Sequence, residues 1–386
     1  MALRVAAAHL REAKAAILAA NAHDLADAEA AGLGRTATDR LRLDESRIES
    51  MASGLETVAD LPDPIGIVVA DDVRPNGLRV RRVRSPLGVV GVIYENRPNV
   101  TSDVAGLCIR SANAAYLRGS SSALRSNQAI VAALRGGIVE AGLPADAISL
   151  VEDTSHATAV EFMRLRGIMD VLVPRGGPSL ITSMLEHATV PVILDGDGNC
   201  HVYVDAAADL DMACAIVVNA KTQRPGVCNA MESLVLHEAI AAAMLDRLVT
   251  AMPEVRLLAD GRARALHPEL ERASDEDFGT EFLDLIATVS VVDDLTAAIE
   301  HIERFGSGHS EAIVTADPDA ARRFLAEVDA AAVLHNASTR FVDGAELGLG
   351  AEVGISTQKL HARGPMGLEA LTSVRWIIQG EGQTRS

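Results

Sequence analysis

The sequence lacks any apolar run of the roughly 18 residues that a membrane-spanning helix needs. Its N-terminal segment, MALRVAAAHLREAKAAILAANAHDL, also lacks the basic-then-apolar order of a secretory signal, because Arg and Glu stand between apolar residues at helical spacing. The net charge of −18 opposes binding to nucleic acids and to anionic membrane surfaces. We therefore expect a cytoplasmic protein with no nucleic-acid partner and no membrane partner.

Cysteine is scarce as well, with four residues, and none forms a C-x-x-C pair or has a histidine at zinc-finger spacing, so we expect no metal site. Cys108 and Cys214 fall in helical apolar runs and Cys200 abuts a strand, which predicts core or structural thiols. Cys228 differs because it follows polar loop residues in Lys221–Glu232, KTQRPGVCNAME. Its residues alone leave two interpretations open, a buried inert thiol and a nucleophile.

The order of elements predicts two domains, which a chain of 386 residues also favours. The first 60 or so residues are mostly helical in pattern. Residues 65–84 read as two strands around the turn RPNG, a hairpin of a kind that often pairs with another chain.

Strands and helices then alternate, and the strand-like runs are apolar on both faces, which is typical of a parallel, doubly wound sheet. A helix is expected to start at Thr101 or Ser102. The segments VPVILDGDG and HVYVD, residues 190–198 and 201–205, are expected to continue this first sheet. A second alternation starts at Met231, so Cys228 lies at the junction of two α/β units, where substrate clefts concentrate.

A G-x-G-x-x-G dinucleotide fingerprint is absent, but polar or glycine-rich stretches follow two of the predicted strands. The first contains Arg118, Ser120 and Ser121, and the second contains Arg175, Gly176 and Gly177. Free N–H groups at a helix start, hydroxyls and a guanidinium together suit a phosphate. Ordinary helix capping and a tight glycine turn are the alternative for each. Two such loops in one sheet favour a nucleotide site.

Two further stretches carry possible site residues. Arg97 and Asn99 follow another predicted strand end, and an Asn amide can donate to an oxyanion, although a turn residue before a helix is the alternative. Residues 346–371 are rich in glycine and in side-chain donors, including Ser356, His361 and Arg363. Such a loop suits capture of a small carboxylate-bearing molecule, and a solvated linker is the alternative.

Several strings together resemble one family over nearly the whole chain: GVVGVIYENRPNVTSDVAGLCIRSANA, LRGSSSALRSN, VLVPRGG, GDGNCHVYVD, NAKTQRPGVCNAMESLVLH, GSGHSEAIVT and GLGAEVGISTQKLHARGPMGLEALT. They are similar to γ-glutamyl phosphate reductase, also called glutamate-5-semialdehyde dehydrogenase, in the aldehyde dehydrogenase superfamily. The strings QRPGVCNA and STQKLHARGPMG are highly specific to it.

The resemblance implies NADPH-dependent reduction of L-glutamate 5-phosphate to the semialdehyde, with release of phosphate, in proline biosynthesis. Cys228 matches the nucleophile, which forms a thioester, and Asn99 with the N–H of Cys228 resembles the oxyanion hole. The remaining implied roles are cofactor binding by Arg118, Ser120, Ser121, Arg175, Gly176, Gly177 and Glu281, and substrate binding by Arg97, Arg224, Ser356, His361 and Arg363.

Two differences from the superfamily bear on the reaction. Hydrolytic members use a glutamate base where this chain has Leu194-Asp195-Gly196, so its absence favours a reductase. Members that prefer NAD tend to carry an acidic residue near Ser121, and the serines here with Arg118 favour NADPH. The rival interpretations are a hydrolytic aldehyde dehydrogenase, for which only Asp195 could serve as base, and a non-catalytic scaffold of the same fold.

The expected fold is therefore α/β and aldehyde-dehydrogenase-like, with two doubly wound domains and a protruding oligomerisation hairpin. The expected boundaries are 1–64 and 85–221 for the cofactor-binding domain, 222–345 for the catalytic domain, 346–371 for a return segment lining the active site, and 65–84 with 372–386 for the oligomerisation elements. We expect a homodimer or tetramer, and a transient contact with a separate glutamate kinase that supplies the substrate.

Overall fold

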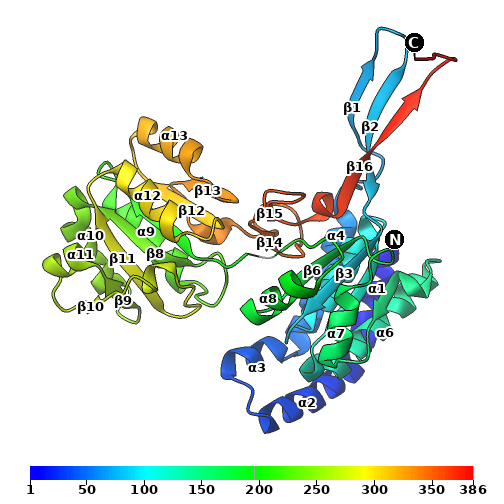
Figure 1. Cartoon of the computed structure of the whole chain (residues 1–386). Helices are drawn as coiled ribbons and strands as arrows, with labels where there is room; N and C mark the ends of the chain where they lie inside the picture. Colours follow the sequence, from blue (N-terminus) through cyan, green and yellow to red (C-terminus); the bar gives the residue numbers. More distant parts are fainter. Residues whose placement is uncertain (195, 386) are drawn as a thin grey trace. The chain divides into compact units, whose positions relative to one another are not determined.

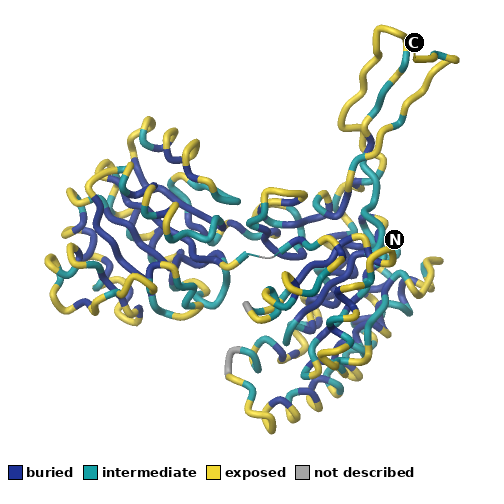
Figure 2. The backbone as a smooth tube through the Cα atoms, viewed as in Figure 1, coloured by how far each residue is buried: buried dark blue, intermediate teal, exposed yellow. Residues whose placement is uncertain are grey.

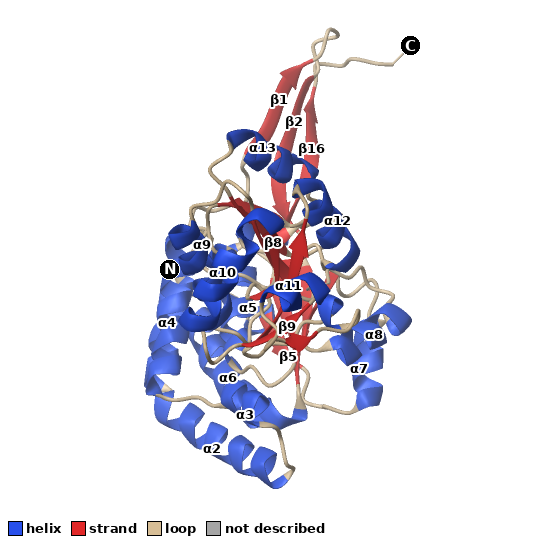
Figure 3. Ribbon diagram, turned by 90° about the vertical axis from the view of Figure 1, so that its left-hand side faces the viewer, coloured by secondary structure: helices blue, strands red, loops and turns tan. Residues whose placement is uncertain are grey.

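The computed structural model describes residues 1–194 and 196–385. Contacts within the chain divide it into two compact units. Unit 1 comprises Met1–Leu194, Gly348–Gly354 and Met366–Ser386, and unit 2 comprises Asp195–Leu347 and Ile355–Pro365. Helices surround strands in both units (Figure 3). No helix in the described ranges is long and apolar enough to cross a membrane.

Unit 1 contains a parallel four-stranded sheet in the order β5-β4-β3-β6. Its strands are β3 (Val89–Tyr94), β4 (Ala114–Gly119), β5 (Ile148–Leu150) and β6 (Val171–Arg175). The helices that follow these strands are α5 (Asn99–Arg110), α6 (Leu124–Glu140), α7 (His156–Met163) and α8 (Pro178–His187). The short η1 (Ser121–Ala123) precedes α6, and η2 (Ala145–Ala147) precedes β5. The predicted strand–helix alternation is confirmed here.

Four N-terminal helices precede this sheet: α1 (Ala2–Glu12), α2 (Lys14–Ala30), α3 (Arg35–Leu41) and α4 (Glu45–Asp60). In α1 the buried residues are Leu3, Ala6, Ala7 and Leu10, which is the spacing of one helix face. That face packs against α4 and α6, so the helical N-terminal segment is an integral part of unit 1.

Two expectations about unit 1 were wrong in detail. Helix α5 begins at Asn99 instead of Thr101 or Ser102, because Pro98 already has helical backbone angles (φ −57°, ψ −30°). The described residues of the segment 190–198 form one isolated bridge, between Val192 and Leu172, and no regular strand. Pro191 has no N–H to donate to a ladder, which limits pairing there.

The predicted hairpin is confirmed as β1 (Val68–Val73) and β2 (Arg79–Pro86), joined at a turn where Gly77 has φ +84°. After η5 (Leu368–Leu371), β16 (Thr372–Gln379) pairs antiparallel with β2 along its whole length. This three-stranded ribbon extends away from the rest of unit 1 (Figure 1) and is largely exposed (Figure 2). Trp376 of β16 is 64% exposed.

Unit 2 contains a parallel seven-stranded sheet in the order β10-β9-β11-β8-β7-β12-β13. Its strands are β7 (Cys200–Val204), β8 (Met231–His237), β9 (Arg256–Ala259), β10 (Glu271–Arg272), β11 (Ile286–Val292), β12 (Ser310–Val314) and β13 (Ala332–His335). The helices are α9 (Leu210–Thr222), α10 (Glu238–Ala251), α11 (Gly261–Leu266), α12 (Leu295–Phe305) and α13 (Pro318–Glu327), with η3 (Asp277–Gly279) and η4 (Thr339–Phe341). The two-residue strands β14 (Ile355–Ser356) and β15 (Gly364–Pro365) pair antiparallel.

The boundary between the units differs from the expected one at residue 221. Strand β7 was expected in the first sheet, but it pairs with β8 and β12 in unit 2, so contacts divide the chain after Leu194. All five residues of β7 are buried. A strand buried on both faces fits the interior of either parallel sheet, so the alternation pattern alone does not assign it.

Candidate active site

Six of the seven residues predicted to bind a cofactor lie at the carboxyl edge of the unit 1 sheet, and the seventh, Glu281, lies in unit 2. Tyr94, at the end of β3, is in register with Gly119 of β4 on one side and with Arg175 of β6 on the other. The loops that follow these three strands therefore start side by side, at the edge where α/β sheets bind ligands. Arg118 lies near the end of β4, and Ser120 and Ser121 follow that strand. Arg97 and the first residue of α5, Asn99, follow β3, and Gly176 and Gly177 follow β6.

Asn96, which was not predicted as a site residue, lies at the centre of this edge. Its backbone is left-handed, with φ +47°, two residues after β3 ends at Tyr94. Its side-chain Oδ1 accepts hydrogen bonds from the hydroxyls of Ser122 and, at 3.3 Å, Ser120. Both hydroxyls therefore hold the amide carbonyl, and the Nδ2 donor of the same amide points away from the two serines. Ser121 is exposed.

The guanidinium of Arg118 is partly engaged by the protein itself. Its Nη2 donates to the carbonyl oxygens of Thr154 at 2.7 Å and Ser155 at 3.0 Å, just before α7. Its Nε is buried and has no hydrogen-bond partner among the described residues. Burial lowers the pKa of Arg118, and the charges of Asp153 and Glu95 oppose that effect. An unpartnered buried donor on a fixed guanidinium suits an anionic ligand.

The second predicted phosphate loop already holds a carboxylate. The N–H of Gly177 donates to Glu95 Oε2 at 3.1 Å. A Cβ added at Gly176 would lie 2.7 Å from the same oxygen, so the glycine permits this close approach. Glu95 thus takes an anion-binding position at the start of α8, and a phosphate there would have to displace it.

Asn99 lies in the first turn of α5 and is exposed. Its Nδ2 donates to Asp103 Oδ2 at 3.0 Å, one helical turn further on. Burial raises the pKa of Asp103 to about 6, and the hydrogen bond from Asn99 and the charge of Arg175 act in the opposite direction. The Asn99 amide therefore has a carboxylate partner within its own helix.

In unit 2, Cys228 lies in the loop between α9 and β8 and is half-buried. Arg224, in the same loop, is exposed. Asn229 directly follows the cysteine and is buried, and its Nδ2 donates to the Val342 carbonyl at 2.8 Å. The loop is therefore fixed on one side of Cys228, and the cysteine residue itself is only half-buried.

The other cysteines are less suited to nucleophilic chemistry. Burial raises the pKa of Cys108 to about 12. Burial raises the pKa of Cys200 far above its ordinary value, and the charge of Glu311 adds to this. Both thiols stay protonated near neutral pH, and the thiolate is the nucleophile. Cys214 was expected in the core but is half-buried on α9.

Gly198 packs directly against the backbone of Cys228. A Cβ added at Gly198 would lie 1.7 Å from the Cys228 carbonyl oxygen, which leaves room for glycine alone. The same oxygen accepts a hydrogen bond from Cys200 Sγ at 3.1 Å. The N–H of Gly198 donates to Glu281 Oε1 at 2.9 Å. The predicted cofactor residue Glu281 therefore lies in unit 2, where it contacts the glycine that packs against Cys228.

Residues Ile355–Pro365 of the return segment belong to unit 2. The N–H of Gly196 donates to the Ile355 carbonyl at 3.1 Å, next to the buried Ser356. His361 is exposed, with a left-handed backbone at φ +67°. Arg363 Nη2 donates to Asp329 Oδ1 at 2.7 Å, and Lys359 pairs with the same carboxylate. These two exposed ion pairs are weak enough for a ligand carboxylate to compete.

Beneath the Cys228 loop, Lys221 and Glu232 form an ion pair at 2.6 Å, and both side chains are fully buried. Burial raises the pKa of Glu232 to about 7 and lowers the pKa of Lys221. The opposite charge of each partner acts against the shift that burial causes in the other. Lys221 lies in the last turn of α9 and Glu232 lies in β8, so the pair joins the two elements that carry the loop.

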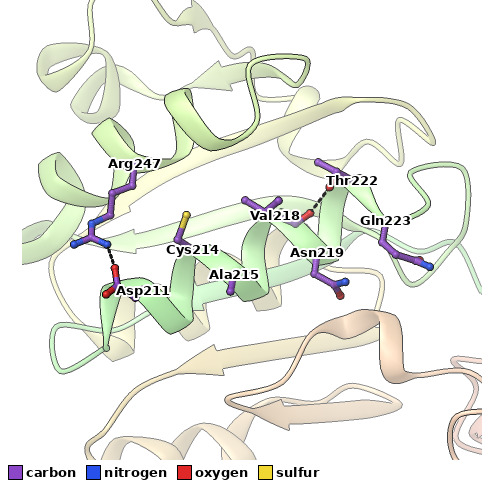
Figure 4. A pocket seen from close by; sticks show the side chains of 8 residues that line it. All are labelled: Asp211, Cys214, Ala215, Val218, Asn219, Thr222, Gln223 and Arg247. Carbon is purple, nitrogen blue, oxygen red and sulfur yellow. Dashed lines mark hydrogen bonds and ion pairs between the residues drawn. The ribbon is translucent and has the colours of Figure 1, made fainter.

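A hollow of about 620 Å³ lies along the outer side of α9. Figure 4 shows its eight lining side chains, among them the ion pair of Asp211 with Arg247 and the hydroxyl of Thr222, which donates to the Val218 carbonyl at 2.8 Å. Cys214 also lines it. None of the lining residues is a predicted site residue. Gln223, the first residue of the Cys228 loop, is the one described residue that the lining of the hollow shares with that loop.

The chain was then compared with known proteins. Residues 4–268 match the model of the aldehyde dehydrogenase family. The γ-glutamyl phosphate reductase of Moorella thermoacetica is 55% identical, over 100% of this chain and 92% of the relative. The solved γ-glutamyl phosphate reductase of Thermotoga maritima is 44% identical with a TM-score of 0.97, covering 100% of this chain and 94% of that one.

The chain belongs to the γ-glutamyl phosphate reductases of the aldehyde dehydrogenase family. It is therefore an oxidoreductase of that family, as the sequence predicted. An acetylating aldehyde dehydrogenase of Geobacillus thermoglucosidasius, 18% identical with a TM-score of 0.71 over 100% of this chain and 92% of that one, shares the fold. The expected aldehyde-dehydrogenase-like α/β fold is confirmed.

Sequence reasoning missed three residues of this reductase that the structure places at the predicted sites: Asn96, Glu95 and Gly198. Asn96 stands where β3 must turn, and Asn tolerates the left-handed backbone better than most residues, so its position was the available signal. Gly198 offered no such signal, because its close contact with Cys228 joins residues 30 positions apart in the chain. Asp195 lies outside the described residues.

Proposed function

We propose that this reductase converts L-glutamate 5-phosphate to L-glutamate 5-semialdehyde and phosphate, with NADPH, in proline biosynthesis. The observation that carries the proposal is Cys228, the half-buried cysteine of a fixed loop, in a chain that belongs to the γ-glutamyl phosphate reductases. Relatives that are 51–55% identical to this chain are also γ-glutamyl phosphate reductases.

The covalent step uses the thiolate of Cys228. Its sulfur attacks the acyl carbon, the bond from that carbon to the phosphate oxygen breaks, and phosphate leaves with the bonding electrons. Phosphate is a good leaving group near neutral pH, so the step needs no proton from a neighbouring acid. A thioester on Cys228 results.

The nicotinamide of NADPH, when bound, supplies the hydride that reduces this thioester. In the protein, the donors at the carboxyl edge of the unit 1 sheet fit the cofactor's phosphates: Arg118 has an unpartnered buried Nε, and the hydroxyl of Ser121 is exposed. Ser120 is tied to Asn96, so its role is to shape the loop. Arg175, Gly176, Gly177 and Glu281 complete the proposed cofactor set. No acidic side chain stands at positions 120–122, which favours NADPH over NADH.

The tetrahedral oxyanion needs a fixed donor, and two asparagines of unit 1 are candidates. Asn99 is the one inferred from the sequence, but its Nδ2 donates to Asp103. Asn96 has its carbonyl oxygen held by two serines, which preorients its Nδ2. Preorganised donors of this kind contribute roughly 10²–10³ in kcat. Asn96→Ala should cost that factor if Asn96 is the donor, and Asn99→Ala should cost it if Asn99 is.

For the substrate, we propose that Arg97, Arg224, Ser356, His361 and Arg363 hold the carboxylate and phosphate groups. Arg224 is exposed beside Cys228, and Arg363 exchanges Asp329 for the ligand. Phosphate-binding arginines are also what a chain of net charge −18 needs to attract an anionic substrate.

The reverse reaction tests the proposal: L-glutamate 5-semialdehyde, NADP⁺ and inorganic phosphate are mixed, and NADPH absorbance is followed. We expect NADPH formation that depends on phosphate and exceeds that with NAD⁺. NADPH formation at a comparable rate without phosphate would instead indicate a hydrolytic enzyme. Ser121→Glu, which places a carboxylate in the proposed cofactor loop, should reduce activity with NADP⁺ more than with NAD⁺.

A further inference from the structure

Arg340 of η4 contacts both ends of the loop that carries Cys228. Its Nε donates to Gln223 Oε1 at 2.8 Å, and its Nη1 donates to Asn229 Oδ1. Gln223 is the first residue after α9, and Asn229 directly follows Cys228. One guanidinium therefore fixes the spacing between the start of the loop and its nucleophile.

The contact is reciprocal and partly shielded from solvent. Asn229 returns a hydrogen bond from its Nδ2 to the carbonyl of Val342, just after η4. Asn229 is 3% exposed and Arg340 is half-buried. A planar guanidinium can hold two acceptors in a fixed geometry, whereas a lysine ammonium supplies the charge without the fork.

Charge is the second effect of Arg340. Burial lowers the pKa of Arg340, while the negative charges of Asp343 and Cys228 oppose that effect and the nearby Arg224 adds to it. Arginine stays protonated in proteins, so the guanidinium that holds Gln223 and Asn229 places a fixed positive charge close enough to Cys228 for the two charges to interact. An adjacent cation favours the thiolate over the thiol.

Other charged or titratable groups also surround the nucleophile loop. Cys200 donates to the Cys228 carbonyl and lies 3.6 Å from His309 Nδ1. Glu281 binds Gly198, which packs on Cys228. Lys221 and Glu232 lie beneath the loop as a neutral pair. The two arginines at the loop, Arg224 and Arg340, supply positive charge that these groups do not.

We propose that Arg340 is a positioning residue that holds the Cys228 loop and stabilises the Cys228 thiolate. This rests on the proposed function only in that Cys228 is the nucleophile. Its effect on the thiol itself exists without substrate, so it can be measured without knowing which acyl phosphate the enzyme uses.

The test is the rate of Cys228 alkylation by iodoacetamide as a function of pH, followed by peptide mass spectrometry to separate Cys228 from Cys214. Wild type, Arg340→Gln and Arg340→Lys are compared, with Arg322→Gln on the exposed face of α13 as a matched control. We expect Arg340→Gln to raise the midpoint of the pH profile by about one unit, as loss of a close opposite charge does. Arg340→Lys should recover most of the shift, and Arg322→Gln should not move it.

An unchanged midpoint in Arg340→Gln would overturn the proposal, as would an equal rise in Arg340→Lys, since that variant keeps the charge. Should Arg340→Gln fail to fold, Gln223→Glu provides a second variant. Its exposed carboxylate pairs with Arg340 and should also raise the midpoint of the pH profile. An unchanged midpoint in Gln223→Glu would overturn the proposal. Failure of the phosphate-dependent reverse reaction with a normal alkylation shift would refute the proposed substrate and leave the role of Arg340 standing.

Discussion

Replacing Gly198 by alanine should displace the nucleophile without altering any charged or polar side chain. The added Cβ would lie 1.7 Å from the carbonyl oxygen of Cys228, 2.4 Å from its carbonyl carbon and 2.5 Å from its Cα. Non-bonded heavy atoms need about 3.5 Å, so one of the two backbone segments must move by more than about 1 Å. All three contacts are backbone atoms, and no rotamer change can relieve them.

The expected loss follows from that displacement. A misplacement of about 1 Å at a reacting group can cost roughly 10²-fold in rate. Overpacking costs about 1–3 kcal/mol of stability, which leaves a folded protein to assay. Gly279→Ala is the matched control, because a Cβ there meets no atom within 4 Å.

Three measurements decide the outcome: kcat in the reverse reaction, the rate of Cys228 alkylation, and the melting temperature. We expect kcat of Gly198→Ala to fall about 10²-fold, with a melting temperature lowered by several degrees, and Gly279→Ala to retain activity. If Gly198→Ala retained kcat within about threefold of wild type, the close packing of Gly198 on Cys228 would not control the position of the nucleophile.

Three further predictions concern stability and assembly. Lys221→Met leaves Glu232 buried without its partner and should lower the free energy of unfolding in urea by about 3 kcal/mol, and a loss below about 1 kcal/mol would show that the pair is dispensable. Burial lowers the pKa of His301 to about 3, so the folded state resists a proton that the unfolded chain accepts below about pH 6.5. Stability should therefore fall as pH drops from about 6.5 toward 3, by about 2 kcal/mol at pH 5, and His301→Phe should remove this part of the slope; parallel slopes would contradict it. Deleting Thr372–Ser386 removes β16 and should weaken a dimer or tetramer seen by light scattering, because the ribbon exposes Trp376 and Ile378 (64% and 61%), whereas a fully active monomer of the intact chain would contradict the assembly.

Periodicity and turn residues predicted much of the fold. Asn76-Gly77 marked the hairpin turn, and Gly77 has the left-handed backbone that such a turn needs. Apolar runs such as Val89–Tyr94 identified buried parallel strands correctly. The domain boundary was wrong because β7 is buried on both faces, and a single sequence does not say which sheet such a strand joins.

The site was predictable where chemistry is local in the sequence. The polar loop around Cys228 indicated a possible nucleophile, and the family resemblance then selected that interpretation. Contacts between distant segments were not predictable. Arg340 lies more than 100 residues after its partners Gln223 and Asn229. Glu95, which follows β3, accepts a hydrogen bond from the N–H of Gly177, which follows β6. These pairings follow from strand order, which local patterns do not encode.

The thioester on Cys228 is the central claim, and a rapid-mixing experiment without phosphate tests it most directly. Wild-type enzyme is mixed with L-glutamate 5-semialdehyde and NADP⁺ in phosphate-free buffer, and NADPH absorbance is recorded before and after phosphate is added. The account predicts a rapid burst of a single equivalent of NADPH per chain, a stall while the thioester waits for phosphate, and sustained turnover once phosphate is present. Cys228→Ser should show neither burst nor turnover. A burst of the same size in Cys228→Ser, or sustained NADPH formation by the wild type without phosphate, would contradict it.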